Sequence, residues 1–143
     1  MSDLKPILVI ESRPKDLEQT LAALARQGLA NPILVARHGP EALDFLNAKG
    51  GAALVLLDLA DSGGAELLAQ VKAGWPRAPV LALVAAGHRA RMAREHPTVP
   101  TLAKPLTGEG LLAAVQDLGQ ALAIVGQATP RGAYVPPGSR LEG

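Results

Sequence analysis

Three charged residues of the sequence, Glu11, Asp58 and Lys104, each come directly after a short apolar segment of the kind that forms a buried strand. Two carboxylates can hold Mg²⁺ through oxygen, and an ammonium group can neutralise a phosphoryl oxygen. The three residue types together therefore suit phosphoryl chemistry on an aspartate. Any one of them alone would be explained more simply as a solvated charge at the end of a strand.

Five segments rich in Val, Ile and Leu are too short for helices and are predicted to be buried strands. They are residues 6–10, 32–36, 52–57, 79–84 and 98–103. Pro100 cannot donate a ladder hydrogen bond, which predicts an edge position for the last strand. Helical patterns alternate with these segments, so we expect an α/β fold in which a parallel sheet carries helices on both faces. The carboxyl ends of parallel strands share one edge of the sheet, where the three charged residues are expected to meet.

The composition fits one globular domain without a general affinity for nucleic acid. The 143 residues are 48% hydrophobic and carry a net charge of +1, which argues against disorder and against a nucleic-acid partner. The absence of cysteine excludes disulfides, thiolate metal sites and cysteine nucleophiles. No apolar run approaches the roughly 20 residues that span a bilayer, and the N-terminus lacks the features of a signal peptide. We therefore expect a cytoplasmic protein with no membrane segment.

The alternation of strands and helices ends near residue 125. We expect one domain over residues 1–125 and an extended tail or linker over residues 126–143, which hold four Gly and three Pro. The final Glu142 and Gly143 fit a remnant of cloning.

Three stretches of the sequence resemble motifs of the receiver domain of bacterial two-component response regulators. ILVIESRPKD is similar to the family's first strand with its acidic pair, VLLDLADSGGAELL to its phosphoacceptor strand and loop, and LAKPL to its Lys-Pro signature. The resemblance covers residues 5–122 and extends to the small single-domain regulators that accompany bacterial phytochromes. It implies a flavodoxin-like, doubly wound sheet of five strands in the order 2-1-3-4-5.

The resemblance also implies a role for each of the three charged residues. Asp58 would accept phosphate from a histidine kinase, Glu11 and Asp58 would hold Mg²⁺, and Lys104 would contact the phosphoryl group. The protein would then be a receiver in a phosphorelay rather than an enzyme, and its partners would be signalling proteins.

Three positions depart from the family pattern. Ser12 stands where the family has a second acid, so Mg²⁺ binding is expected to be weak or absent. Val84 stands where the family has a Ser or Thr that hydrogen-bonds the phosphoryl group, and valine cannot donate. Thr101 stands where an aromatic side chain usually swings inward. The relay from phosphate to surface is therefore predicted to be disabled.

Two functions from different classes fit these residues, and a third fits less well. Asp58 and Lys104 favour a phosphoryl-accepting switch, whereas Ser12 and Val84 favour a pseudo-receiver that binds partners without being phosphorylated. A phosphohydrolase of the haloacid dehalogenase type would need an acid two residues after its nucleophile, and Ala60 occupies that place.

A homodimer is the expected assembly, formed through the fourth helix, the fifth strand and the last helix. Receivers commonly pair on this face, and an edge strand offers backbone groups to a partner. The residues expected to contribute charge pairs and apolar contacts are Arg89, Arg91, Arg94, Glu109, Asp117, Tyr134 and Val135.

Overall fold

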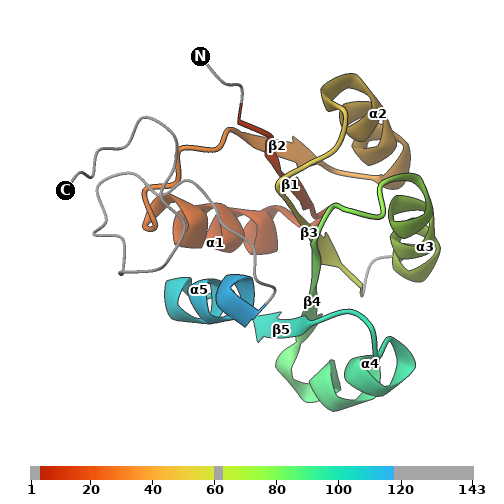
Figure 1. Ribbon diagram of the computed structural model, residues 1–143. Coiled ribbons are helices and arrows are strands. Elements are labelled where there is room, and N and C mark those ends of the chain that lie inside the picture. Colours follow the sequence, from red (N-terminus) through yellow and green to blue (C-terminus); the bar gives the residue numbers. More distant parts are fainter. Residues whose placement is uncertain (1–3, 60–62, 118–143) are drawn as a thin grey trace.

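The computed structural model describes residues 4–59 and 63–117 of the chain. Five strands form one parallel sheet in the order β2-β1-β3-β4-β5, which confirms the predicted fold class and strand order (Figure 1). The strands are β1 (Ile7–Ile10), β2 (Ile33–Ala36), β3 (Leu54–Asp58), β4 (Val80–Ala85) and β5 (Thr101–Lys104). β5 lies at one edge of the sheet, as Pro100 predicts, but it begins at Thr101 and ends at Lys104 rather than covering residues 98–103. The predicted tail over residues 126–143 lies outside the described residues.

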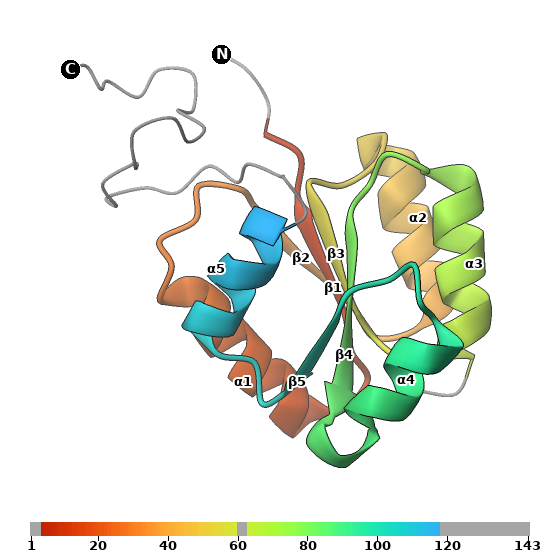
Figure 2. The ribbon, with the colours of Figure 1, turned by 60° about the horizontal axis from the view of Figure 1, so that its bottom comes forward.

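Helices cover both faces of this sheet. They are α1 (Pro14–Ala25), α2 (Gly39–Lys49), α3 (Gly64–Gly74), α4 (Arg89–Glu95), which follows the 3-10 turn η1 (Ala86–His88), and α5 (Gly108–Asp117). Figure 2 shows α1 and α5 on one face, with α2 and α3 on the other. Pro14 starts α1 where its missing N–H costs nothing, and Gly50 ends α2 at a φ of 70°. None of the described helices is long and apolar enough to cross a membrane.

Alternation along the strands divides the core into two apolar clusters. On β3, Leu54 and Leu56 pack toward α1 and α5, whereas Val55 and Leu57 pack toward α2 and α3. Asp58 continues the first of these two series, and Glu11 continues the corresponding series of β1. Side-chain alternation therefore directs both carboxylates toward α1.

The N-terminus of α3 lies against the end of β3. A Cβ atom at Gly64 would lie 2.9 Å from the backbone oxygen of Leu59 and 3.1 Å from that of Asp58. These oxygens belong to the backbone and cannot rotate away as a flexible side chain could. Gly63 turns the chain into the helix with a φ of 80°, a value that favours glycine. The two glycines thus allow α3 to start close beside Asp58.

Replacing Gly64 by alanine is expected to lower the free energy of unfolding by roughly 1 to 3 kcal/mol, because the new methyl group meets backbone atoms. Gly74→Ala in the same helix is the matched control, since its Cβ meets nothing within 4 Å. That variant should be as stable as the wild type or slightly more stable. Urea denaturation measures both effects, and equal stability of the two variants would show that the contact at Gly64 relaxes without cost.

Candidate functional site

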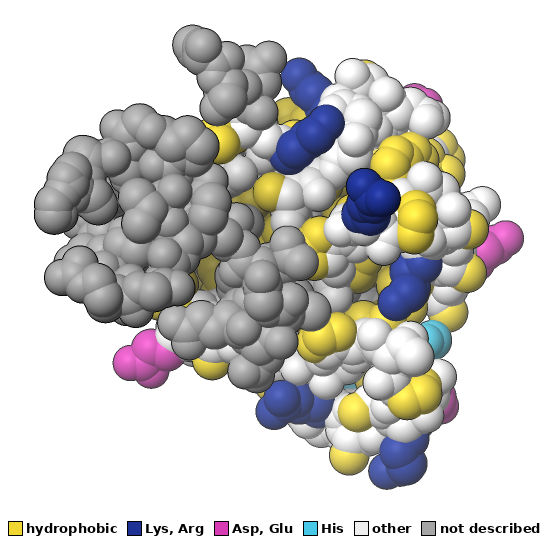
Figure 3. All heavy atoms as spheres, viewed as in Figure 1, with side chains coloured by type: hydrophobic (Ala, Val, Ile, Leu, Met, Phe, Trp, Pro, Cys, Tyr) yellow, Lys and Arg dark blue, Asp and Glu magenta, His cyan; other side chains and the backbone are white. Residues whose placement is uncertain are grey.

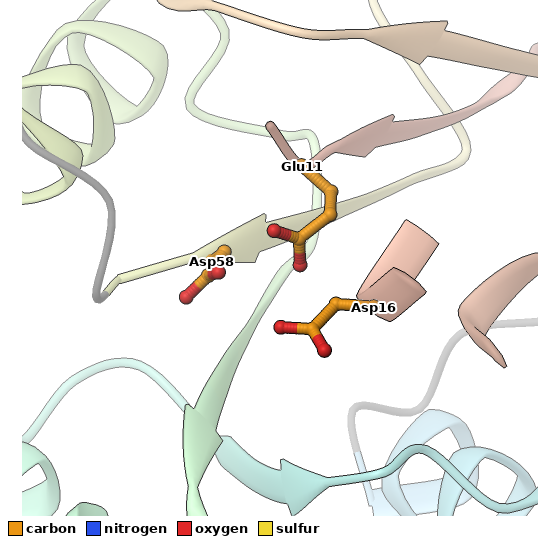
Figure 4. Close-up of side chains that lie close together, drawn as sticks. All are labelled: Glu11, Asp16 and Asp58. Atoms are coloured by element: carbon orange, nitrogen blue, oxygen red, sulfur yellow. The ribbon is translucent and has the colours of Figure 1, made fainter. Parts of the chain in front are cut away.

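The carboxyl edge of the sheet brings together three carboxylates from different elements. Glu11 follows β1, Asp58 ends β3, and Asp16 lies in the first turn of α1. One oxygen of each lies within 4.8 Å of the others, and Figure 4 shows the side chains converging. Glu11 and Asp58 are fully buried, so their negative charges need compensation inside the protein.

Lys104 provides this compensation from the last position of β5. Its Nζ lies 2.5 Å from Oδ2 of Asp58, 2.9 Å from Oδ2 of Asp16 and 3.0 Å from Oε1 of Glu11. It donates hydrogen bonds to both aspartates. The structure therefore brings together the three charged residues that the sequence singles out, while their roles stay predictions.

Asp16 is the member of the cluster that sequence reasoning missed. In the sequence it looks like an ordinary acid in the first turn of a helix, where a negative charge is favoured by the helix dipole. The available signal was its position only five residues after Glu11, at the start of the helix that follows β1. A local role was sufficient to explain it, so only the tertiary structure reveals its contact with Lys104.

A second cation, Arg13, borders the cluster at the start of α1. Its backbone N–H donates to Oε2 of Glu11 at 3.2 Å, which holds that carboxylate in place. One guanidinium nitrogen lies 3.6 Å from Oδ2 of Asp58 and 3.8 Å from Oδ2 of Asp16. Two cations, Lys104 and Arg13, therefore face the three carboxylates. The sequence analysis did not predict that Arg13 belongs to the site.

Burial and ion pairing act against each other within the cluster. Burial raises the pKa of Glu11 to about 7, although its contact with Lys104 opposes this shift. Burial alone would lower the pKa of Lys104, but its hydrogen bonds to the carboxylates raise that pKa above the ordinary value. Lys104 therefore stays charged at neutral pH, while Glu11 is partly protonated.

The three carboxylates suit a hard divalent cation such as Mg²⁺ or Mn²⁺, which prefers oxygen ligands. Oε1 of Glu11 is buried and accepts no hydrogen bond within the described residues, although it forms an ion pair with Lys104. Such an oxygen is available to a cation. The cation would compete with the ammonium group for the same oxygens, so Lys104 must give up part of its contacts when a metal ion binds.

The three positions that depart from the receiver pattern carry no charge that could add to this cluster. Val84 is 1% exposed and packs in the apolar core on the side of α2 and α3. Thr101 is buried in β5. Ser12 is exposed and lines, together with Asp58, a hollow of about 690 Å³ beside α2 and α3. β4 therefore offers the site no side-chain hydroxyl, as the sequence predicts.

Comparisons with known structures find proteins of the same architecture. The bacteriophytochrome response regulator AtBRR is 36% identical and has a TM-score of 0.77, over 88% of this chain and 100% of that one. The bacteriophytochrome response regulator RtBRR is 34% identical with a TM-score of 0.74, over 89% and 85%. The Mn²⁺-bound form of response regulator Rcp1 is 26% identical with a TM-score of 0.58, over 80% and 91%. No protein-family model matches the sequence, and a comparison with curated proteins finds no match.

Asp16→Asn is expected to weaken Mn²⁺ binding on the order of tenfold, because it removes one of three carboxylate charges and keeps the side-chain shape. Glu18→Gln is the control, since Glu18 is an exposed acid of the same helix. Calorimetric titration at pH 8 measures both affinities. Weak Mg²⁺ binding, which the sequence predicts from Ser12, stays a prediction. Asp16 is a third carboxylate that this prediction does not include.

The same titration at pH 6 should give a lower affinity for the wild type. Glu11, with its pKa raised to about 7, must lose a proton before it can bind a cation. For the titration at pH 8, equal Mn²⁺ affinities of Asp16→Asn and Glu18→Gln would exclude Asp16 from the metal site.

Proposed function

Because the chain belongs to the receiver family of two-component response regulators, we propose that it is a cytoplasmic signalling module in which Asp58 accepts a phosphoryl group from a histidine kinase. The observation that carries this proposal is the 2.5 Å contact between buried Asp58 and Lys104. This contact puts a positive charge where a phosphoryl group on Asp58 would add negative charge.

In the proposed reaction, an oxygen of the Asp58 carboxylate attacks the phosphorus atom of phosphohistidine on the kinase. A P–O bond to Asp58 forms while the P–N bond breaks, and the departing histidine nitrogen keeps the electron pair of that bond. Lys104 follows the developing charge by moving one of its donors from the carboxylates to a phosphoryl oxygen. Glu11, Asp16 and Asp58 are the residues that would hold a divalent cation, and such a cation would supply further positive charge at the site.

The hollow beside α2 and α3 is the route that we propose for the phosphodonor. Asp58 forms part of its wall, next to Gly63 and Gly64 at the start of α3. Glycines leave room at this wall because they carry no side chain. The Lys104 cluster lies on the α1 side of Asp58, so donor and ammonium group would reach the carboxylate from different sides.

The alternative function is a pseudo-receiver that binds partners without being phosphorylated. Val84 favours it, because the side chains of β4 offer no hydrogen bond to a phosphoryl oxygen. Both functions use the same fold, and both imply a signalling partner. Chemistry at Asp58 distinguishes them.

Incubation with acetyl phosphate and Mg²⁺ is expected to add one phosphoryl group to Asp58, detected by mass spectrometry of the intact protein and of its peptides. Acetate leaves with the electron pair of its P–O bond, so no enzyme is needed for this test. Asp58→Asn should take up no phosphoryl group, whereas Glu18→Gln, which changes an exposed acid of α1 away from the hollow, should behave as the wild type. An unmodified wild-type protein would contradict the phosphoacceptor and leave the pseudo-receiver.

We also propose that the chain forms a homodimer through α4, β5 and α5. β5 is an edge strand, and no described strand pairs with its outer side. Arg89, Arg91 and Arg94 of α4 are exposed, and Figure 3 shows Lys and Arg side chains at the end of the molecule where α4 lies. Glu109 on α5 is exposed and offers the opposite charge. The side chain of Asp117 and the tail residues Tyr134 and Val135 lie outside what the structure describes.

Charge reversal at this face is expected to weaken the dimer. Arg91→Glu would replace attraction to an acid of the second chain by repulsion at each of two symmetric positions. Each lost ion pair would lower the free energy of dimerisation by roughly 0 to 1 kcal/mol. Arg77→Glu, at an exposed site between α3 and β4, is the matched control. Sedimentation equilibrium measures both dissociation constants, and a wild type that is monomeric at all concentrations would contradict the dimer.

A further inference from the structure

Arg13 is an exposed cation that forms an ion pair with Asp58, the proposed phosphoacceptor. It caps the N-terminus of α1 without a side-chain cap hydrogen bond, and its side chain is 54% exposed. One guanidinium nitrogen lies 3.6 Å from Oδ2 of Asp58, which is longer than a hydrogen bond. The guanidinium is therefore held near Asp58 by charge and is not fixed by a direct bond. A small rotation would lengthen these ion pairs but break no hydrogen bond of the guanidinium among the described residues.

A phosphoryl group on Asp58 would need more donors than the rest of the cluster provides. It carries between one and two negative charges and three acceptor oxygens. Lys104 can reach one of these oxygens but already serves three carboxylates. β4 offers no donor from its side chains, because Val84 is apolar and buried.

We propose that Arg13 binds the phosphoryl group of phosphorylated Asp58 and supplies the hydrogen bonds that Val84 cannot make. The inference rests on the proposed function and adds a binding residue to it. A guanidinium group presents several N–H donors in a planar fork that matches two phosphoryl oxygens. Before phosphorylation the same group partly neutralises Asp58 and Asp16. After phosphorylation it moves outward from the carboxylate to the oxygens of the new group.

The position of Arg13 in the backbone supports this role. Its N–H donates to Glu11, so the residue is anchored at the edge of the site while its side chain extends over Asp58. Within the described residues, Lys104 and Arg13 are the two cations that form ion pairs with Asp58. Lys104 reaches it from the protein interior, with its side chain 13% exposed, and Arg13 reaches it from the solvent side.

Binding of trifluoroberyllate, a tetrahedral analogue that adds to an aspartate as a phosphoryl group does, tests the proposal. The full chain is titrated with beryllium fluoride at an Mg²⁺ concentration that saturates each variant, and fluorine NMR reports the bound analogue. Arg13→Ala should bind it roughly tenfold more weakly than the wild type, the effect of one lost charged hydrogen bond. Arg13→Lys should lie between the two, because a lysine offers a point charge without the planar fork.

Arg26→Ala is the matched control, since Arg26 is an exposed arginine at the other end of α1 and its loss changes the net charge equally. It should bind the analogue as the wild type does. Wild-type affinity of Arg13→Ala would overturn the role of Arg13. A wild-type protein that neither binds the analogue nor gains a phosphoryl group from acetyl phosphate would instead contradict the proposed function.

Discussion

The arrangement of the site depends on the ion pairs that Lys104 forms with the three carboxylates. Its ammonium group lies within 3.0 Å of an oxygen from each of three carboxylates, two of which are fully buried. Without Lys104, the carboxylates of Glu11 and Asp58 would be buried close together and would lose their buried partner. Removing one partner of a buried ion pair lowers the free energy of unfolding by about 3 to 5 kcal/mol. β4 lies between β3 and β5, so the long side chain of Lys104 must cross the end of β4 to reach Asp58. One side chain thus links the edge strand, the central strand and the start of α1.

Side-chain alternation explains how much of the site the sequence could predict. Glu11 and Asp58 are separated by more than forty residues, yet each continues an alternating apolar strand at its carboxyl end. The period of two and the parallel order of the strands are enough to place them on one edge. Asp16 and Arg13 have no such signal, because a first-turn acid and a residue before a helix are explained by local helix chemistry. Their participation depends on how α1 packs on the sheet, which no local pattern contains.

Asp16 also changes the meaning of the serine at position 12. The sequence suggests that the site has lost a carboxylate, since Ser12 is neutral and exposed. The structure shows three carboxylates around Lys104, because Asp16 enters from the helix one turn later. The charge of the cluster is thus similar to that of a site with an acidic pair on the first strand. The missing hydroxyl at Val84 has no such replacement among the side chains of β4, whereas the guanidinium of Arg13 presents donors 3.6 Å from Oδ2 of Asp58.

The position of Lys104 also restricts how chemistry at Asp58 could reach the surface. Lys104 ends β5, and its strand partner on β4 is Ala85, an exposed residue directly before η1. In the proposed reaction, the ammonium group would exchange a carboxylate oxygen for a phosphoryl oxygen, and any displacement of Lys104 would act first on the backbone of β5 at the edge of the sheet. Thr101 at the other end of the strand is buried and small, so it cannot amplify that displacement by moving an aromatic ring between two positions. A signal from this site would therefore be carried by the edge strand itself, whose outer backbone groups are the ones that a second chain would contact.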